Sequence, residues 1–129
     1  MNEFAIIRKN DSLHVMKENG TEVNYYLFNE AEIHVNHILP HTVQEWHFHH
    51  RISENILVMH GKLLCRYLDQ QGNEQQVELL AGDLICVGKA AHTFENNTEE
   101  TVEFIVFRYL PTGKNLREIM KKDKTVIDR

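Results

Sequence analysis

The stretch that decides the fold of this chain is His47-Phe48-His49-His50-Arg51-Ile52-Ser53-Glu54. Its two histidines at i and i+2 point to the same face of a β-strand, because successive strand side chains alternate sides. Burying such imidazoles without a partner costs several kcal/mol. The spacing therefore predicts a strand that presents His47 and His49 together to a common partner.

Two further residues can reach the same face. Glu54 stands at the start of the next expected strand, and His92 comes from a distant one. Three imidazoles and one carboxylate suit a divalent transition metal such as Mn, Fe, Co, Ni, Cu or Zn. We expect one such ion per chain as the cofactor, bound by His47, His49, Glu54 and His92. The ligand set does not select among these metals.

Length and charge limit the classes of partner. A chain of 129 residues has the usual size of one domain, which we expect to span 1–129. The formal net charge of −5 lacks the basic footprint of a nucleic-acid-binding protein. No apolar segment is long enough to span a bilayer, and the first residues do not resemble a signal peptide. These features predict a cytoplasmic protein without a nucleic-acid or membrane partner.

The usual catalytic arrangements built on a nucleophile are missing from this sequence. Cys65 and Cys86 lie inside apolar runs, which predicts two reduced, partly buried thiols. We find no serine, cysteine or lysine nucleophile motif and no glycine-rich phosphate loop. If the protein is an enzyme, the metal carries the chemistry, and the sequence assigns no catalytic residue besides the ligands.

Short apolar or alternating runs recur about every ten residues and are separated by turn signals such as Glu18-Asn19-Gly20 and Ala81-Gly82-Asp83. Many short strands at this spacing predict an all-β sandwich or barrel. The expected strands cover residues 4–7, 13–16, 23–28, 33–39, 55–59, 63–68, 76–80, 84–87 and 102–110.

The end of the chain breaks this rhythm. Leu116, Ile119 and Met120 are spaced as on a short amphipathic helix. The lysines that follow, at positions 121, 122 and 124, suit the solvated carboxyl end of that helix better than a binding patch. The strand at 102–110 is apolar on both faces, so we expect it to pack a core on one side and a helix or a second subunit on the other. This predicts a homodimer.

Two motifs resemble those of the cupin superfamily. His47-x-His49-x4-Glu54-x6-Gly61 fits the first cupin motif, at 47–61, and the segment from Gly82-Asp83 to His92-x-Phe94-x-Asn96 resembles the second, at 82–96. The resemblance implies a small single-domain cupin, with a jelly-roll (double-stranded β-helix) barrel and a short C-terminal helix. It also implies a metal at the barrel mouth held by His47, His49, Glu54 and His92. The turn before His92 departs from the pattern: it has Gly88-Lys89-Ala90-Ala91 in place of the usual proline and glycine, and is one residue shorter.

Other polar residues are candidates for the cavity wall. His34 and His37 have opposite strand parity, so at most one of them faces inward. His60 is the spare imidazole best placed for acid–base work, although a hydrogen-bonded strand-end histidine is the commoner role. His50 is expected at the surface. Tyr25, Tyr26, Arg66 and Arg108 are further candidates for the mouth, and the sequence does not say which of them point inward.

Three functions fit these features. Four protein ligands leave two positions open on a six-coordinate ion, and the net charge of the centre, about +1, favours an anionic or oxygen-rich small molecule. The first function is therefore a metal-dependent enzyme of the dioxygenase, isomerase or decarboxylase type. The second is a non-catalytic module that binds or senses a small molecule, for example a carbohydrate. The third is a structural barrel with incidental histidines, which the ligand spacing disfavours.

Overall fold

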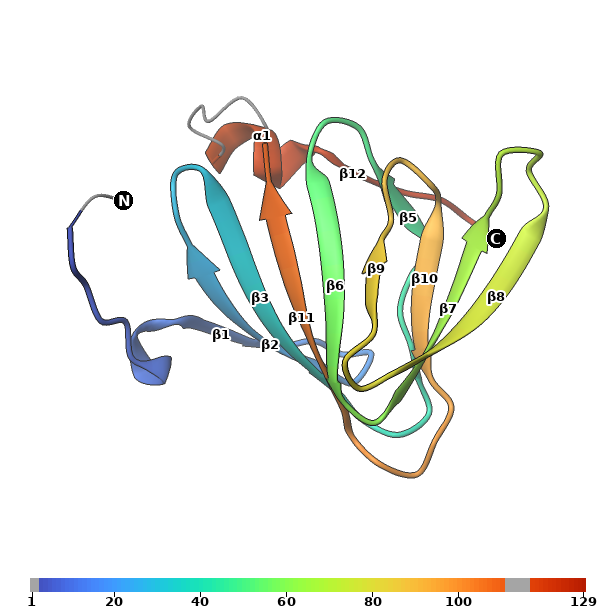
Figure 1. Ribbon diagram of the computed structural model, residues 1–129, viewed down its shortest axis with the longest axis horizontal. Helices are drawn as coiled ribbons and strands as arrows, with labels where there is room; N and C mark the ends of the chain where they lie inside the picture. Colours follow the sequence, from blue (N-terminus) through green and yellow to red (C-terminus); the bar gives the residue numbers. More distant parts are fainter. Residues whose placement is uncertain (1–2, 111–116) are drawn as a thin grey trace.

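The computed structural model describes residues 3–110 and 117–129. Nearly all of its regular structure is β-strand, arranged in two antiparallel sheets that face one another (Figure 1). The all-β prediction is therefore confirmed. No helix among the described residues is long and apolar enough to cross a bilayer.

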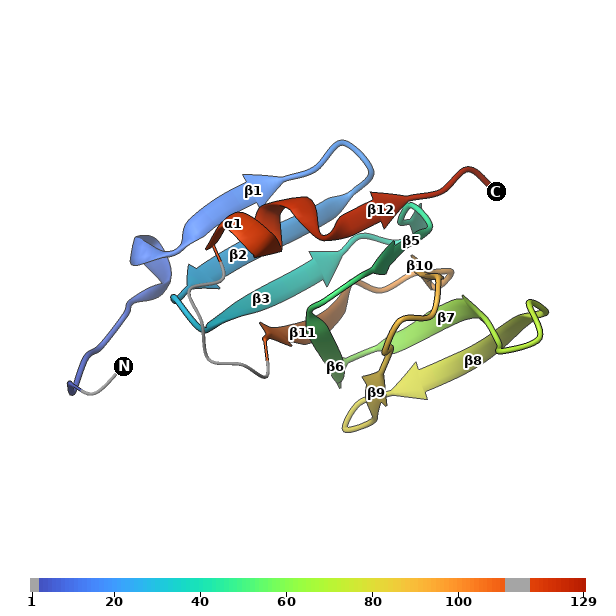
Figure 2. The ribbon, with the colours of Figure 1, turned by 90° about the horizontal axis from the view of Figure 1, so that it is seen from above.

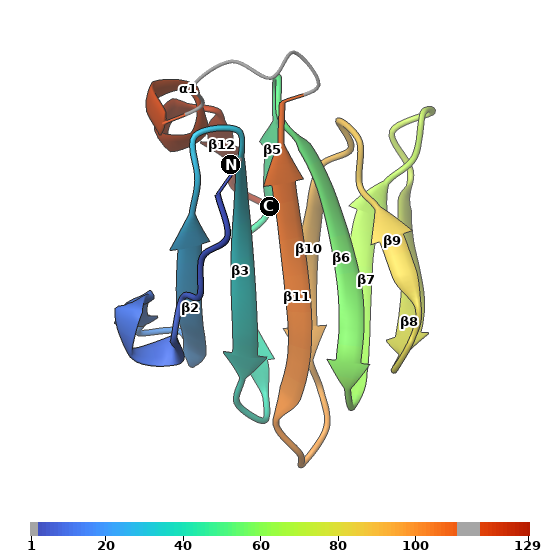
Figure 3. The same ribbon diagram turned by 60° about the vertical axis from the view of Figure 1, so that its left-hand side comes forward.

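Each sheet has six strands, and Figure 3 shows most of the first sheet in front of the second. The first sheet consists, in spatial order, of β1 (Leu13–Met16), β2 (Thr21–Leu27), β3 (Ala31–Ile38), β11 (Val102–Tyr109), β6 (Ser53–His60) and β9 (Leu84–Cys86). The second consists of β12 (Lys124–Val126), β5 (His47–His49), β10 (His92–Asn96), β7 (Lys62–Leu68) and β8 (Glu74–Leu80), with β4 (Thr42–Val43) paired to β10.

The inward face of the first sheet changes from polar to apolar along its length. β11 is antiparallel to both β3 and β6, so the end of β11 meets the starts of the other two strands. In this register Arg108 lies opposite Glu32 on one side and Glu54 on the other. At the far end of β11, Val102 lies opposite Ile38. One end of the barrel is therefore lined by charged groups and the other by hydrocarbon.

The apolar end holds the main core, which brings together inward-facing side chains of both sheets. Its fully buried members include Phe104, Ile56 and Leu63. The turn from β6 to β7 passes close to this core at Gly61, which has φ +86°. A Cβ atom on Gly61 would lie 2.9 Å from Val102 Cγ2. The glycine that closes the first motif is thus required by both its backbone conformation and its packing.

The clearest differences from the expected strands concern three segments. Residues 4–7 were expected to form a strand, but they form none and are exposed, and they lead into a short 3-10 helix, η1 (Lys9–Asp11). This prediction is wrong because these apolar residues have no neighbouring strand with which to form backbone hydrogen bonds. The short strands β4 and β12 have no counterpart among the expected runs, since two or three residues carry no readable alternation.

The carboxyl-terminal segment also departs from expectation. A short helix, α1 (Arg117–Lys122), and β12 lie over the end of the sheets where β11 ends (Figures 1 and 2). Leu116 lies outside the described residues, and Ile119 packs on Ile52 and Leu110. Lys124 does not belong to a solvated helix end as expected, because it is the first residue of β12 and pairs with His49.

Candidate metal centre

The four residues expected to bind metal come together from the two facing sheets. His47 and His49 lie on the inward face of β5, and His92 at the start of β10 is the ladder partner of His47. Glu54, on the inward face of β6, comes from the opposite sheet. Their side chains are buried, with exposed fractions of 8%, 2%, 1% and 6% for His47, His49, His92 and Glu54.

The ligand atoms of these four residues lie within 4.8 Å of one another. His49 Nε2 is 3.1 Å from Glu54 Oε2, and His92 Nε2 is 3.7 Å from Glu54 Oε1. The His47 ring centroid lies 4.4 Å from that of His92 and 5.1 Å from that of His49. The donors therefore surround one small volume.

Backbone carbonyls orient two of the three imidazoles. His47 Nδ1 donates to the carbonyl oxygen of Glu45 at 3.1 Å, and His92 Nδ1 donates to that of Ala90 at 2.8 Å. A proton on Nδ1 leaves the Nε2 lone pair free, as in metal-binding histidines whose other nitrogen is held by an outer partner. The Ala90 carbonyl belongs to the shortened turn before His92. The turn therefore still directs this imidazole inward.

Three nitrogens in the cluster are buried and have no hydrogen-bond partner, namely Nε2 of His92 and both ring nitrogens of His49. Leaving such a group unpaired costs about 1–3 kcal/mol. His49 Nε2 is close to the Glu54 carboxylate but lacks hydrogen-bond geometry toward it. A divalent transition metal would satisfy both Nε2 lone pairs and the carboxylate at once, so the cluster suits such an ion.

The ionisation states of His47 and Glu54 are those that a metal needs. Burial, with His92 alongside, lowers the pKa of His47 to about 4. Burial alone would raise the pKa of Glu54, but the imidazoles of His49 and His92 and the cationic Arg108 hold it well below its usual value. At pH 7 His47 is therefore neutral and Glu54 is ionised, and neither must lose a proton before binding a cation.

Asp123 fixes the loop that joins His49 to Glu54. Its carboxylate accepts hydrogen bonds from the backbone N–H groups of His50, Arg51 and Ile52 at distances of 2.9–3.2 Å. Three successive N–H groups around one carboxylate form a compact anion nest. Asp123 is buried between α1 and β12. The carboxyl-terminal segment thereby holds the loop between His49 and Glu54, a role that the sequence did not reveal.

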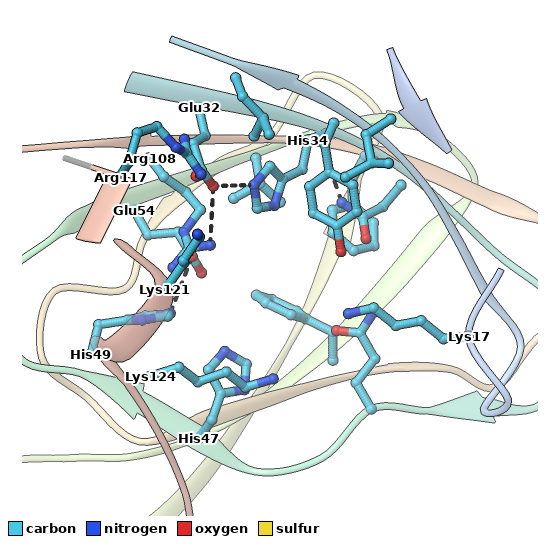
Figure 4. Close-up of a pocket in the computed structure, with 18 residues that line it drawn as sticks. Lys17, Glu32, His34, His47, His49, Glu54, Arg108, Arg117, Lys121 and Lys124 are labelled. Carbon is cyan, nitrogen blue, oxygen red and sulfur yellow. Dashed lines mark hydrogen bonds and ion pairs between the residues drawn. The ribbon is translucent and has the colours of Figure 1, made fainter. Parts of the chain in front are cut away.

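A cavity of about 410 Å³ opens beside three of the four residues, His47, His49 and Glu54 (Figure 4). His92 lines a neighbouring cavity of about 470 Å³. The first cavity is rich in cations, although the whole chain carries a formal charge of −5. Its charged lining residues are Lys17, Arg108, Arg117, Lys121 and Lys124, with the carboxylates Glu32 and Glu54. Lys121 is exposed in the last turn of α1, as expected, and it also lines this cavity, whereas the expectation of a helix end is wrong for Lys124, which lies in β12.

Arg108 links the four-residue cluster to the next wall of the cavity. Its guanidinium Nε lies 3.2 Å from Glu54 Oε2, and its Nη1 lies 3.4 Å from Glu32 Oε1. Glu32 also accepts from His34 Nε2 at 2.7 Å and from Arg117 Nη2 at 2.5 Å. A network of buried carboxylates and half-buried guanidinium groups thus joins β3, β11, β6 and α1 around the cavity.

Of the other residues considered from the sequence, some face the cavity and others do not. Tyr25, His34 and Arg108 line it. Tyr26, His60 and Arg66 are not among its lining residues, and Arg66 instead pairs with Glu95 across the outer side of β7. His50 is exposed, as expected, and its Nε2 contacts Thr125 Oγ1 at 2.7 Å. Both cysteines are free thiols, but Cys86 is exposed and only Cys65 is buried.

Comparison with solved structures supports the architecture. The chain superposes on the formate complex of an oxalate decarboxylase from Lactobacillus farciminis with a TM-score of 0.71 at 17% identity, covering 86% of this chain and 35% of that one. It matches Peruvianin-I, a cysteine peptidase from Thevetia peruviana latex, with a TM-score of 0.72 at 13% identity, covering 95% and 76%. It also matches a recombinant oxalate oxidase in complex with glycolate with a TM-score of 0.65 at 16% identity, covering 83% and 59%.

These identities show a shared fold only. The chain spans about a third of the length of the oxalate decarboxylase. A comparison with curated protein sequences finds no match. The family model described as "Cupin domain" matches residues 34–108, which is more than half of the chain and includes all four clustered residues. This match, together with the two-sheet barrel and its cluster of histidines and glutamate, shows that the chain belongs to the cupin family.

Proposed function

We propose that this protein is a metal-dependent enzyme acting on a small, oxygen-rich, anionic metabolite. In this proposal His47, His49, Glu54 and His92 bind one divalent transition metal. The observation that carries it is the convergence of three imidazoles and one carboxylate, of which His47, His49 and Glu54 line a cavity of about 410 Å³. Dioxygenase, isomerase and decarboxylase chemistry are all compatible with such a centre. A non-catalytic module that binds or senses a small molecule such as a carbohydrate is the alternative.

The charge of the cavity supports an anionic substrate. When bound, the ion supplies a Lewis acid with open positions for oxygen donors. The side chains of Lys17, Lys121 and Lys124 come from three separate segments and surround the same space (Figure 4). Lys124 also pairs with Glu45 at 2.6 Å, which leaves it at the edge of the cavity. Two proteins of similar fold were solved with formate and with glycolate, which are small carboxylates of the class proposed.

Metal content tests the ligand set. Protein purified without chelator should contain about one equivalent of a transition metal by elemental analysis. The double substitution His47→Ala with His49→Ala should remove it. His37→Ala is a matched control, because His37 lies on the outer side of β3 and pairs with Glu103. Stoichiometric metal in the double variant would exclude His47 and His49 as ligands.

The role of Glu54 needs a more conservative change. Glu54→Gln preserves the shape of the side chain but removes its negative charge, so the affinity for the metal should fall. Calorimetric titration of both proteins with Mn(II), Fe(II), Ni(II) and Zn(II) measures the loss. Equal affinities of both proteins for all four ions would exclude Glu54 as a ligand.

Turnover separates an enzyme from a binding module. Metal-loaded protein should consume a small hydroxy- or keto-acid, and the consumption should stop when the metal is removed with a chelator. A compound that binds the loaded protein and is recovered unchanged would favour the alternative function.

A further inference from the structure

A second pair of buried ionisable groups faces the cavity from β3. Glu32 and His34 stand at i and i+2 on its inward face, with exposed fractions of 4% and 8%. His34 lies across the open space from His47 (Figure 4). Neither residue belongs to the cluster of four. Burying two ionisable groups costs free energy unless they are paired and hydrogen-bonded.

The surroundings of Glu32 determine which nitrogen of His34 carries the proton. Burial alone would raise the pKa of Glu32, but the hydrogen bond from His34 and the cationic Arg108 lower it. Arg117 adds a second guanidinium contact. An ionised carboxylate only accepts hydrogen bonds, so His34 Nε2 must be the donor in the 2.7 Å contact. The lone pair of the neutral ring is therefore on Nδ1.

The His34 ring is held so that Nδ1 faces the open part of the cavity. The edge-to-face contact with Tyr25, with centroids 4.5 Å apart, restrains the ring from the side of β2. Figure 4 shows the nitrogen that does not contact Glu32 pointing toward the space between His34 and His47. An imidazole fixed by a carboxylate on one nitrogen and open on the other is the usual arrangement of a general base.

The charge state of His34 is also suitable. Burial lowers its pKa, and Arg108 on β11 acts in the same direction, while Glu32 on β3 and the more distant Glu54 on β6 partly oppose this. At neutral pH the ring is therefore uncharged and able to accept a proton.

We propose that His34, oriented by Glu32, is a proton-transfer residue that acts on a C–H group next to the carbonyl of an anionic hydroxy-ketone or keto-acid. This inference rests on the proposed function, because the metal centre is what would hold the substrate in the cavity. It selects isomerisation among the reaction types that the centre allows.

The step balances without any oxidant or reductant. The C–H bond breaks, and its proton moves to Nδ1 of His34. The electron pair of that bond becomes the C=C bond of an enolate, while the carbonyl π pair moves onto oxygen. Glu32 remains ionised and stabilises the imidazolium through Nε2–H. Return of the proton to the neighbouring carbon, together with transfer of the enediol hydroxyl proton to the former carbonyl oxygen, gives the isomer and restores neutral His34.

Hydrogen exchange tests this step directly. Hydroxypyruvate is an anionic keto-acid whose hydroxymethyl protons lie next to the carbonyl. Zn(II)-loaded wild-type protein in D₂O should accelerate the incorporation of deuterium at that carbon. Mass spectrometry of hydroxypyruvate measures the rate of incorporation. His34→Asn should reduce the acceleration by about 10²- to 10⁴-fold. His37→Asn is the matched control, from the outer side of the same strand, and should behave as the wild type.

Zinc affinity, measured by calorimetry on the same proteins, separates the two hypotheses. Exchange lost in His34→Asn while zinc affinity is unchanged would support the base. Equal exchange in His34→Asn and wild type would overturn this inference and leave the metal centre standing. Failure of the wild type to bind zinc would reject the metal centre and the inference that rests on it.

A second measurement needs no metal. Nitrogen-15 NMR of metal-free protein should show His34 protonated on Nε2 and not on Nδ1. Glu32→Gln should weaken this tautomer preference and slow the zinc-dependent exchange without loss of zinc affinity. Protonation of Nδ1 in the wild type would overturn the proposal, because that nitrogen would then have no lone pair to offer.

Discussion

The two ends of the same three strands, β3, β11 and β6, differ in what they bury. At one end the inward positions hold Glu32, Arg108 and Glu54, and at the other end of β3 and β11 they hold Ile38 and Val102. Strand alternation places residues inside equally at both ends. The residues that stabilise the fold and the residues that could carry chemistry therefore lie at opposite ends of the same strands. Hydrocarbon side chains fill the apolar end, and ionisable groups line the polar end.

The polar end also contains most of the buried nitrogens that make no hydrogen bond. Buried nitrogens of His49, His92 and Arg108 that make no hydrogen bond lie there, although one more, Nδ1 of His37, lies near the other end on the outer side of β3. Functional sites commonly break the rules that the rest of a fold obeys, at a cost that the remaining core offsets. The following predictions test this division of labour, from the largest expected effect to the smallest.

Truncation in the apolar end should have the largest effect on stability. Phe104→Ala removes a ring that is 1% exposed and packs on Phe94. The free energy of unfolding should fall by about 3–5 kcal/mol, while the protein that remains folded keeps its metal affinity. Urea unfolding of metal-free protein measures the loss, and His49→Ala at the polar end should cost less. A Phe104→Ala cost below that of His49→Ala would contradict the division between the two ends.

Acid should act on the polar end. His47 has a pKa of about 4 in the folded protein and close to 6.5 when unfolded. Between these values the unfolded chain binds more protons, so stability falls as the pH falls. His47 alone should account for roughly 2 kcal/mol of loss by pH 5 in metal-free protein. Unfolding measured at pH 7 and pH 5 should show a smaller decline for His47→Asn, and an equal decline would refute this assignment.

The sequence predicted the parts of this site that depend on local periodicity. The i, i+2 spacing of His47 and His49 places both on one face, and this holds in β5. The opposite parity of His34 and His37 separates them, so that only His34 faces the cavity. The apolar inward positions of 102–110 also lie in the core. In each case the period of two residues carries the information.

Contacts between residues far apart in the chain could not be read this way. Asp123 binds the backbone at His50, 73 residues away, and no local pattern marks it. Lys124 was assigned to a helix end because its neighbours are lysines, but three residues of β12 pair with β5. Glu32 gave no signal because an isolated glutamate in a strand is usually exposed. Its burial depends on Arg108 and Arg117.

Asp123 offers a way to weaken the polar end without touching a candidate ligand. Asp123→Asn removes the charge that holds three backbone N–H groups and should loosen the loop between His49 and Glu54. Metal affinity should fall about 10- to 100-fold, as expected for an outer partner of a metal site. Asp69→Asn is the control, since Asp69 also accepts two backbone N–H groups but in the β7–β8 turn. Equal metal affinity of the two variants by calorimetry would exclude a positioning role for Asp123.

The smallest effect on the fold is expected from substitutions on the outer surface of the barrel, where β11 has a second apolar face. Ile105 and Phe107 point away from the core and are only half-buried, and they lie beside Val35, Leu57 and Ile33 in the ladder. A strand whose outer face is exposed to solvent normally has polar residues on that face. We therefore predict that this apolar patch is the interface between two copies of the chain in a homodimer. Light scattering should give about twice the chain mass of 15.2 kDa.

A charge in this patch would break the dimer while leaving the barrel intact. Ile105→Lys should yield a mass near that of one chain and change the unfolding free energy of the monomer by about 0.5 kcal/mol or less, as for other surface substitutions. Leu80→Lys adds the same charge to an exposed apolar position on the second sheet, and should leave the mass unchanged. A wild-type mass near 15.2 kDa at working concentration would reject the dimer. The apolar outer face of β11 would then be exposed to solvent in a monomer. In that case the only contrast along β11 would be the one between its polar end and its apolar end.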